Sequence, residues 1–386
     1  MSTFNELIDF TRSTTGTYLG SDGLLKTAAV DEPRLEYDAQ GNALGLLIEE
    51  ARTNLIAYSA VTTVNWSQTG STNTNRNDNA LGVFSGLDVV SNGQTWNRAS
   101  ISLTIVSGNT YAVTVFYKEG TAENVRITCR ANGVESNLGG QAGSLTIFSE
   151  SAGPLTLLSE EDYGGIKKVT LLWTPNSSSG VSFGIGPNSN VSGESVIAYG
   201  AQVETGTFPT SYIPTEGSSV TRAVDSAVAT LSKFYYRQKN GSMVVEFTSK
   251  YDESAVLYKK VCEIGNTGTG INRILLFAKT DETRLSTHVY DNNVFQTGTN
   301  LTSSLPNGTG VYSKTAYAWE TNNAHAAFDG NVVGSVDTDV SLTQTRDTLG
   351  IMRGPTNTAA TLTGHIKSIQ YYPLRVADAK LETLTS

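Results

Sequence analysis

The chain has 386 residues, of which 38% are hydrophobic and 16% charged, and its formal net charge is −9 at pH 7. This acidic balance argues against nucleic acid or an anionic membrane surface as a partner, because such binding needs clustered Lys and Arg. The sequence contains neither the ~18 apolar residues in a row of a spanning helix nor the basic and apolar regions of a signal peptide. We therefore expect no membrane insertion, and folding in the compartment where the chain is made.

Residues 1–58 contain two turn signals, Ser21–Gly23 and Ala39–Asn42, each between short β-prone runs. They predict two small β-hairpins. Two hairpins alone bury too little surface to be stable. We therefore expect residues 1–58 to lie on the following domain, on a neighbouring copy of the chain or on another protein, and to serve as an assembly motif.

Residues 59–213 are predicted to form one all-β domain. Apolar and polar residues alternate in short segments separated by turn signals, as in Tyr111–Tyr117 and Val125–Cys129. Short antiparallel strands with one buried face are typical of a β-sandwich. Periodicity does not give the strand order, so the kind of sandwich stays open at this point.

A seam follows at residues 200–225, with the sequence GAQVETGTFPTSYIPTEGSSVTRAVD. Pro209 and Pro214 cannot donate to a sheet, and each biases the residue before it away from the helical region. The segment should therefore be extended and semi-rigid. Its apolar residues should pin it to the first domain: Phe208, Tyr212 and Ile213. Residues 214–228 are expected to link two β-domains, with the first slack at Gly217–Ser219.

Residues 229–386 are predicted to form a second β-sandwich, because the same alternation recurs in segments such as Met243–Phe247. Asp329–Gly330 is a two-residue hairpin signal, since both central positions of that turn need positive φ. The chain should end in one short helix, with Asp378 in its first turn and Leu381 on its apolar face.

Three stretches resemble one known family: the seam, FDGNVVGS together with the closing GHIKSIQYYPLRVADAKLETL, and an N-terminal signature. The signature residues are Phe10–Arg12, Thr17–Tyr18, Asp22–Gly23, Pro33–Arg34, Tyr37–Asp38, Gly45–Glu49 and Arg52–Leu55. Over almost its whole length the chain is similar to structural proteins of tailed bacteriophages. The resemblance implies a jelly roll like a carbohydrate-binding module at residues 59–213 and a concanavalin A-like (LamG-like) domain at residues 229–386.

Three arginines of the N-terminal signature are candidate functional residues: Arg12, Arg34 and Arg52. The carboxylates near them in sequence are Asp22, Glu36, Glu49 and Glu50. In one interpretation the arginines clamp a substrate. In the favoured interpretation they form bidentate ion pairs that fix hairpins or subunits together, so we treat them as assembly residues.

Trp66 and Trp96 lie in polar sequence surroundings and are the candidates for a carbohydrate-binding platform, because sugars are recognised by aromatic faces combined with polar side chains. Core packing is the favoured alternative for each, since tryptophan is mostly buried and its N–H needs only one partner. Trp173 and Trp319 lie in clear strand patterns and are predicted to belong to the cores.

We expect no catalytic residue, no cofactor and no metal site. Ser182 matches a nucleophile-elbow pattern, but it lies in a strand pattern rather than at a strand-to-helix corner. The three histidines are predicted to be surface or hydrogen-bonded residues rather than general bases. Glu160–Asp162 is predicted to form a solvated turn, and no strand shows the paired carboxylates of a glycosidase. Cys129 and Cys262 are expected to be small buried hydrophobes.

These observations and the resemblance lead us to expect a non-enzymatic virion structural protein, in a tail fibre, baseplate or head appendage. Its partners would be other virion proteins, further copies of itself, with a trimer favoured, and a host glycan. It would fold in the cytoplasm of the bacterial host and end in the virion. The alternatives are a capsid decoration protein, a free receptor adhesin and a polysaccharide-degrading enzyme.

Overall fold

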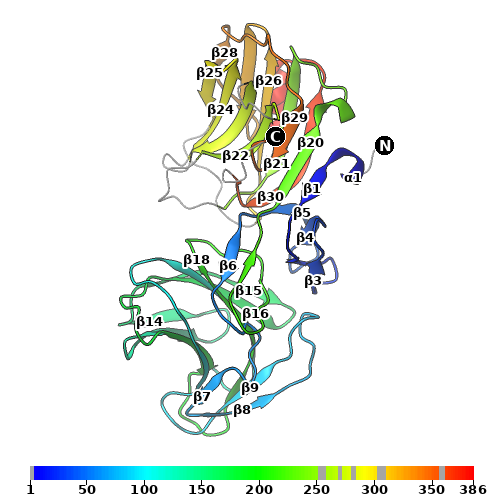
Figure 1. Cartoon of the computed structure of the whole chain (residues 1–386). Helices are drawn as coiled ribbons and strands as arrows, with labels where there is room; N and C mark the ends of the chain where they lie inside the picture. Colours follow the sequence, from blue (N-terminus) through cyan, green and yellow to red (C-terminus); the bar gives the residue numbers. More distant parts are fainter. Residues whose placement is uncertain (1–3, 251–257, 268–271, 280–283, 302–309, 356–360) are drawn as a thin grey trace.

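The computed structural model describes residues 4–250, 258–267, 272–279, 284–301, 310–355 and 361–386. Two lobes stand end to end, and the N-terminal hairpins lie between them (Figure 1). Each lobe is a pair of antiparallel sheets, so the predicted class of two β-sandwiches is confirmed. Two further two-stranded sheets join β2 (Gly16–Leu19) to β3 (Leu25–Ala28) and β6 (Arg52–Asn54) to β19 (Val220–Arg222).

The first lobe is a jelly roll of two six-stranded sheets. One sheet has the order β14 (Thr146–Glu150), β13 (Val134–Gly140), β12 (Val125–Ala131), β17 (Ser182–Pro187), β10 (Arg98–Ser102), β7 (Ser67–Thr69). The other has the order β15 (Leu155–Tyr163), β16 (Ile166–Trp173), β11 (Tyr111–Glu119), β18 (Ser195–Thr205), β9 (Leu87–Ser91), β8 (Ser71–Asn75). Val125, Ile127 and Cys129 point into the core between the sheets, and Arg126 and Arg130 alternate with them on the outer face.

The second lobe is a concanavalin A-like sandwich of two seven-stranded sheets. One sheet has the order β28 (Asn331–Asp337), β27 (Asn323–Phe328), β26 (Ser313–Glu320), β21 (Gly241–Phe247), β30 (Gly364–Tyr372), β5 (Ala43–Ile48), β4 (Arg34–Tyr37). The other has the order β1 (Asp9–Thr11), β20 (Ser226–Thr230), β29 (Thr348–Ile351), β22 (Tyr258–Gly265), β23 (Arg273–Lys279), β24 (Arg284–Asp291), β25 (Val294–Asn300).

The hairpins of residues 1–58 divide between the two lobes, which corrects the expectation for this segment. The β2–β3 hairpin lies on the jelly roll as expected, where Leu25 N donates to Leu81 O at 2.9 Å. In contrast, β5 pairs with β30 and β1 pairs with β20, so both strands extend sheets of the second sandwich. Leu46 and Ile48 point into the core of that sandwich, and this burial within the same chain explains why β5 covers the edge of β30.

Residues 214–228, which we expected to be a partly flexible linker, contain regular strand structure. The apolar residues before them are buried on the jelly roll as expected: Phe208, Tyr212 and Ile213. Gly217–Ser219 is exposed. However, Val220–Arg222 forms β19 and pairs with β6, and β20 begins directly afterwards at Ser226. The two lobes are therefore joined by two paired strands.

The expected hairpin and terminal helix are confirmed. Asp329 and Gly330 have φ of 42° and 82° and connect β27 to β28. The helix α2 (Asp378–Thr385) has Asp378 in its first turn and buries Leu381 on the outer face of the β26–β27 sheet. Two shorter helices were not expected, α1 (Phe4–Leu7) and the 3-10 turn η1 (Leu231–Lys233).

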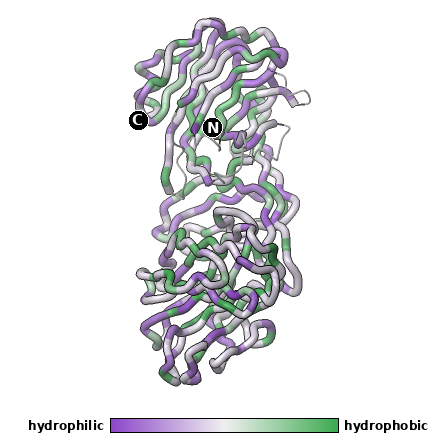
Figure 2. The backbone as a smooth tube through the Cα atoms, turned by 90° about the vertical axis from the view of Figure 1, so that its left-hand side faces the viewer, coloured by the Kyte–Doolittle hydropathy of each residue, from purple (hydrophilic) through white to green (hydrophobic). Residues whose placement is uncertain are grey.

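Hydrophilic and hydrophobic residues are interspersed along the strands of both lobes (Figure 2). The residues predicted to lie in the cores are fully buried: Cys129, Trp173, Cys262 and Trp319. Among the described residues, no helix has the length and apolarity needed to cross a membrane.

Candidate functional site

A buried ion-pair network joins the N-terminal segment to the seam. Asp225 Oδ1 lies 3.1 Å from Arg12 Nη1, and Asp225 Oδ2 lies 2.5 Å from Arg34 Nη2. Arg34 also binds Glu49 at 2.8 Å, and Arg222 lies 3.4 Å from Glu49. All five residues are at most 2% exposed. Three guanidinium groups and two carboxylates therefore share a volume with almost no access to water.

Arg12 and Arg34 form their ion pairs with residues of the same chain. This agrees with the interpretation in which the arginines fix the hairpins in place. Besides Asp225, Arg12 Nη2 donates to Ala29 O at 2.7 Å and Arg34 Nη1 donates to Thr17 O at 2.9 Å. Each arginine thus ties hairpin backbone to the seam. Because both are buried, neither guanidinium can reach a substrate in solution.

Arg52 lies near this network but pairs separately. Its Nη2 is 2.8 Å from Glu50 Oε1, and its guanidinium lies over the ring of Phe208 at 4.5 Å from the centroid. Arg52 therefore also holds the N-terminal segment against the seam. A role of the arginines between subunits stays a prediction. The partners Arg222 and Asp225 were not singled out from the sequence, although both belong to the TRAVD end of the seam motif.

Glu49 makes the stability of the network depend on pH. Burial would raise its pKa, but Arg222 and Arg34 outweigh burial and hold the pKa of Glu49 far below its usual range. Its folded-state pKa is therefore below the unfolded value of about 4.3, so Glu49 contributes stability that is present above about pH 5 and lost as the pH falls. We expect the urea midpoint to fall between about pH 5 and pH 3, and to fall less in Glu49→Gln. A wild-type midpoint that is constant over this range would contradict the expectation.

The two tryptophans considered as a platform lie in different environments. Trp66 is 2% exposed, packs edge-on against Phe183, and donates from Nε1 to Tyr58 O at 3.0 Å. It cannot stack on a sugar, so the platform interpretation of Trp66 is corrected and the core interpretation holds. Trp96 is 45% exposed, with the Arg126 guanidinium 4.7 Å from its ring centroid. Trp96 is therefore free to present one ring face to a ligand.

Trp96 borders an open groove of about 470 Å³ on the outer face of the β14–β7 sheet. Phe148 of β14 is half exposed and supplies a second aromatic side chain. The polar lining comes from neighbouring strands: Arg98, Arg130, Glu135 and Asn137. Exposed aromatic rings beside charged and amide groups can combine stacking with hydrogen bonds to hydroxyls, which is the chemistry that sugar recognition requires.

The polar lining of the groove is held in place but retains hydrogen-bonding capacity. Arg98 Nη1 lies 2.8 Å from Glu135 Oε1, and Arg130 Nε lies 4.0 Å from the same oxygen. Glu135 Oε2 is buried and has no hydrogen-bond partner. Gly186 allows the segment before β10 to approach β17, because a Cβ at this position would lie 1.9 Å from Asn97 O. Only Trp96 was found from the sequence, since the other groups come together through a strand order that the sequence does not give.

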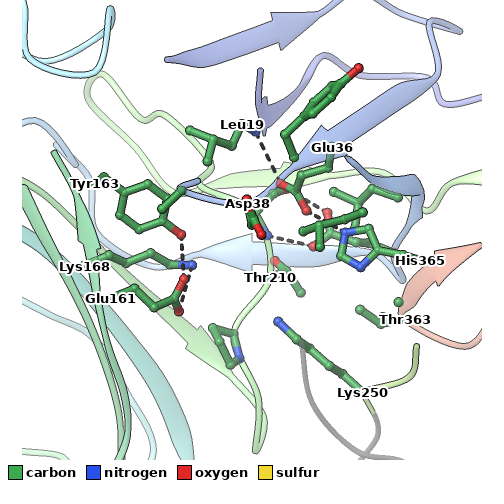
Figure 3. Close-up of a pocket in the computed structure, with 18 of the residues that line it drawn as sticks. Leu19, Glu36, Asp38, Glu161, Tyr163, Lys168, Thr210, Lys250, Thr363 and His365 are labelled. Carbon is green, nitrogen blue, oxygen red and sulfur yellow. Dashed lines mark hydrogen bonds and ion pairs between the residues drawn. The ribbon is translucent and has the colours of Figure 1, made fainter. Parts of the chain in front are cut away.

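A second pocket, of about 260 Å³, lies at the junction of the β4–β5 hairpin, the jelly roll and the second sandwich (Figure 3). We call it the junction pocket. Glu36 and His365 face it from β4 and β30, and Glu161 and Lys168 face it from β15 and β16. The prediction of a solvated turn at Glu160–Asp162 was wrong, because β15 continues through these residues to Tyr163.

Carboxylates meet at the junction pocket, and neighbouring groups lower the pKa of both Glu36 and Glu161. Burial opposes the charge on Glu161, but Lys168 and a hydrogen bond from Tyr163 lower its pKa to about 2. His365 Nε2 lies 2.7 Å from Glu36 and lowers the pKa of that carboxyl against burial. Hydrolysis of a glycoside needs one carboxylic acid that is protonated at working pH. A lowered pKa does not favour Glu36 or Glu161 as a general acid.

The buried histidines are paired, as the hydrogen-bonded interpretation expects. His365 Nε2 lies 2.7 Å from Glu36 Oε2, and His325 Nε2 lies 3.2 Å from Gly334 O. His288 packs 4.7 Å from the ring of Phe277. In the part of the chain that the structure describes, no group of three or more His, Cys, Asp or Glu side chains is arranged to hold a metal ion.

The fold defines a chain of two β-sandwiches. No protein-family model and no curated protein sequence matches the chain, so the resemblance to tailed-phage proteins depends on the sequence motifs alone. One similar solved structure is the Ruminococcus gnavus IT-sialidase CBM40 bound to α2,6-sialyllactose, at 14% identity over 39% of this chain and 84% of that chain, with a TM-score of 0.33.

Two others resemble a larger share of the chain. Mouse laminin α1 domains LG4-5 are 10% identical over 74% of this chain and 88% of that chain, with a TM-score of 0.28. Trypanosoma rangeli sialidase in complex with sialic acid is 11% identical over 83% of this chain and 62% of that chain, with a TM-score of 0.33. Likenesses with TM-scores this low do not identify a function for the chain.

Proposed function

We propose that the chain is a non-enzymatic structural protein of a tailed-bacteriophage virion, placed in a tail fibre, baseplate or head appendage. One observation carries the proposal: charged residues of the phage-like motifs, Arg12, Arg34, Glu49 and Asp225, are buried in ion pairs that lock the N-terminal segment to the seam between the two lobes. Motif residues that are buried in such ion pairs help to keep the elongated chain rigid. Such a rigid chain suits assembly with other virion proteins and with copies of itself.

Virion membership can be tested on particles of the phage that encodes the chain. The chain should sediment with intact particles through a density gradient, and antibody label should decorate the tail or baseplate. Label over the capsid surface would favour the alternative of a decoration protein. A chain that stays in the lysate while complete particles sediment would overturn the proposal. Light scattering on the purified protein should give three times the 41.1 kDa chain mass for the favoured trimer.

We further propose that the groove beside Trp96 binds a host glycan. Its support is the pair of exposed rings, Trp96 and Phe148, around the charged groups Arg98 and Glu135. Trp96→Ala is expected to weaken binding to a bacterial-surface glycan array at least about tenfold, because truncation of an aromatic anchor removes most of the energy of such a contact.

The control for Trp96→Ala is Tyr235→Ala, which removes a ring that is 94% exposed and lies outside the groove. Neither variant should change the thermal unfolding temperature by more than a degree or two, because neither side chain is buried. Equal glycan binding by wild type and Trp96→Ala would remove the groove as the adhesion site. Release of reducing ends from host capsule or lipopolysaccharide would instead favour the enzyme alternative.

A further inference from the structure

The junction pocket is built from three separate parts of the chain. Glu36 comes from the N-terminal hairpin, Lys168 from the jelly roll, and Lys250 and His365 from the second sandwich (Figure 3). Its volume of about 260 Å³ lies just below the usual range for small-molecule sites. It therefore has room for one small molecule, and it exists only when both lobes are in place.

Lys250 is a cation of the pocket that has no directly paired carboxylate among the described residues. Its side chain points into the pocket (Figure 3). Within the described residues its ammonium makes no ion pair of 4 Å or less and no side-chain hydrogen bond. Its backbone is fixed by a hydrogen bond from Lys250 N to Thr363 O at 2.7 Å. Burial and the neighbouring Lys168 lower the pKa of Lys250, and more distant carboxylates only partly oppose this effect: those of Glu36, Glu49 and Glu161. An anionic group between the ammonium groups of Lys250 and Lys168 would offset both the cost of burying Lys250 and its repulsion by Lys168.

The other walls limit what that anion can be. Glu161 Oε2 accepts from Tyr163 OH at 2.6 Å, and Glu36 Oε1 accepts from Leu19 N at 3.3 Å. Each carboxylate has further lone pairs that could accept from ligand hydroxyls. The pocket is lined by five carboxylates, most of which have a cationic partner: those of Glu36, Asp38, Glu49, Glu161 and Asp162. Their negative charge repels a dianion such as phosphate more strongly than a ligand with a single carboxylate. The surroundings therefore fit a polyhydroxy acid.

A small cavity of about 50 Å³ adjoins the junction pocket and shares its lining at Glu36, Tyr163 and Lys168. It is also lined by Thr114, which is 3% exposed and whose Oγ1 has no hydrogen-bond partner. A buried hydroxyl without a partner is costly, and a ligand hydroxyl or a bound water would satisfy it. The ammonium of Lys250 in the junction pocket and the hydroxyl of Thr114 in the adjoining cavity are two independent observations that favour a bound ligand.

We propose that the junction pocket binds an acidic monosaccharide unit, with the ligand carboxylate between Lys250 and Lys168 and its hydroxyls on Glu36 and Glu161. This is a second binding site, separate from the groove beside Trp96, because it faces the outer side of the opposite jelly-roll sheet. It depends neither on glycan binding at the groove nor on a place in the virion. A bound sugar acid would contact both lobes and stabilise their junction.

The experiment compares D-glucuronate with D-glucose, since the two sugars differ only in the carboxylate at C6, and adds inorganic phosphate as a dianion. Full-length protein is treated with an amine-acylating reagent, and the modification of each lysine is followed by mass spectrometry. Glucuronate should slow the modification of Lys250 while the exposed Lys118 reacts at an unchanged rate. Glucose and phosphate should protect neither lysine.

Affinity measurements by calorimetry complete the test. Lys250→Gln should weaken glucuronate binding at least about tenfold, because it removes a charge-assisted contact, whereas Lys118→Gln and Trp96→Ala should leave it unchanged. Equal protection by glucose, or Lys250 modification that glucuronate does not slow, would overturn the proposal. Loss of glucuronate binding in Trp96→Ala would also overturn it, by moving the acid site to the groove. Labelling of the wild type decides the question even if Lys250→Gln does not fold.

Discussion

Replacing Asp225 with alanine is expected to destabilise the chain by about 3–5 kcal/mol, the usual cost of removing one partner from a buried ion pair. Asp225 is fully buried and binds both Arg12 and Arg34, and it also accepts from Glu49 N at 2.8 Å. Its loss would leave Arg12 without any carboxylate partner and Arg34 with Glu49 alone. Urea unfolding followed by circular dichroism measures the effect.

The control for Asp225→Ala is Asp9→Ala, which breaks an ion pair of 2.9 Å with Lys233 whose carboxylate is 54% exposed. Solvent screens that pair, so the midpoint should hardly move. Asp225→Asn keeps the shape of the side chain but removes its charge. Its loss of unfolding free energy should lie between the losses of Asp225→Ala and Asp9→Ala. If Asp225→Ala unfolds at the wild-type midpoint, the network does not hold the N-terminal segment against the seam.

The fold class could be predicted because it is a local property of the sequence. Alternation in segments such as Val125–Cys129 reports which side chains share a face, and one buried face per strand is enough to define a sandwich. Strand pairing is not local. Ile48 lies opposite Gly364 in the second sandwich, and no pattern near either residue predicts this pairing. The hairpins were therefore predicted correctly, but part of their packing was not.

The buried network shows what a sequence motif does and does not reveal. The signature pointed to Arg12 and Arg34, and its acidic surroundings suggested ion pairs. Which carboxylate each arginine binds depends on Asp225 being carried to the N-terminal segment by the pairing of β19 with β6. That pairing is a tertiary contact, so the residues could be predicted from the sequence and their geometry could not.

The same limit explains the two tryptophans. Polar neighbours surround Trp66 and Trp96 alike in sequence, yet only one ring faces solvent. Trp66 N donates to Thr62 O at 3.1 Å, so a tight turn before β7 directs its ring inward onto Phe183. Trp96 ends a segment that bends over β12, where Arg126 supports its ring from one side. Side-chain direction outside a regular strand depends on such turns, which composition does not show.

Trp66→Ala should therefore act on stability and not on a binding surface. Removal of a buried indole costs about 3–5 kcal/mol of stability. This cost is the sum of the lost transfer free energy of the ring and the free energy of the cavity that remains. The contact with Phe183 at 6.3 Å between ring centroids would be lost, and Tyr58 O would lose its indole donor. Urea unfolding should show the jelly roll of the variant melting at clearly lower denaturant, and Trp66→Phe should lose less, because it keeps a ring in the cavity.

Comparison with Trp96→Ala separates the two roles. Both variants should be compared in buffer without denaturant, where both are folded. Trp66→Ala should then bind the array glycans as the wild type does. Trp96→Ala should be as stable as the wild type but bind these glycans weakly. Trp66 touches the core from the inner side of the sheet, whereas Trp96 lies on the outer face. A folded Trp66→Ala that is as stable as the wild type yet has lost glycan binding would contradict this assignment, because only an exposed ring could produce that result.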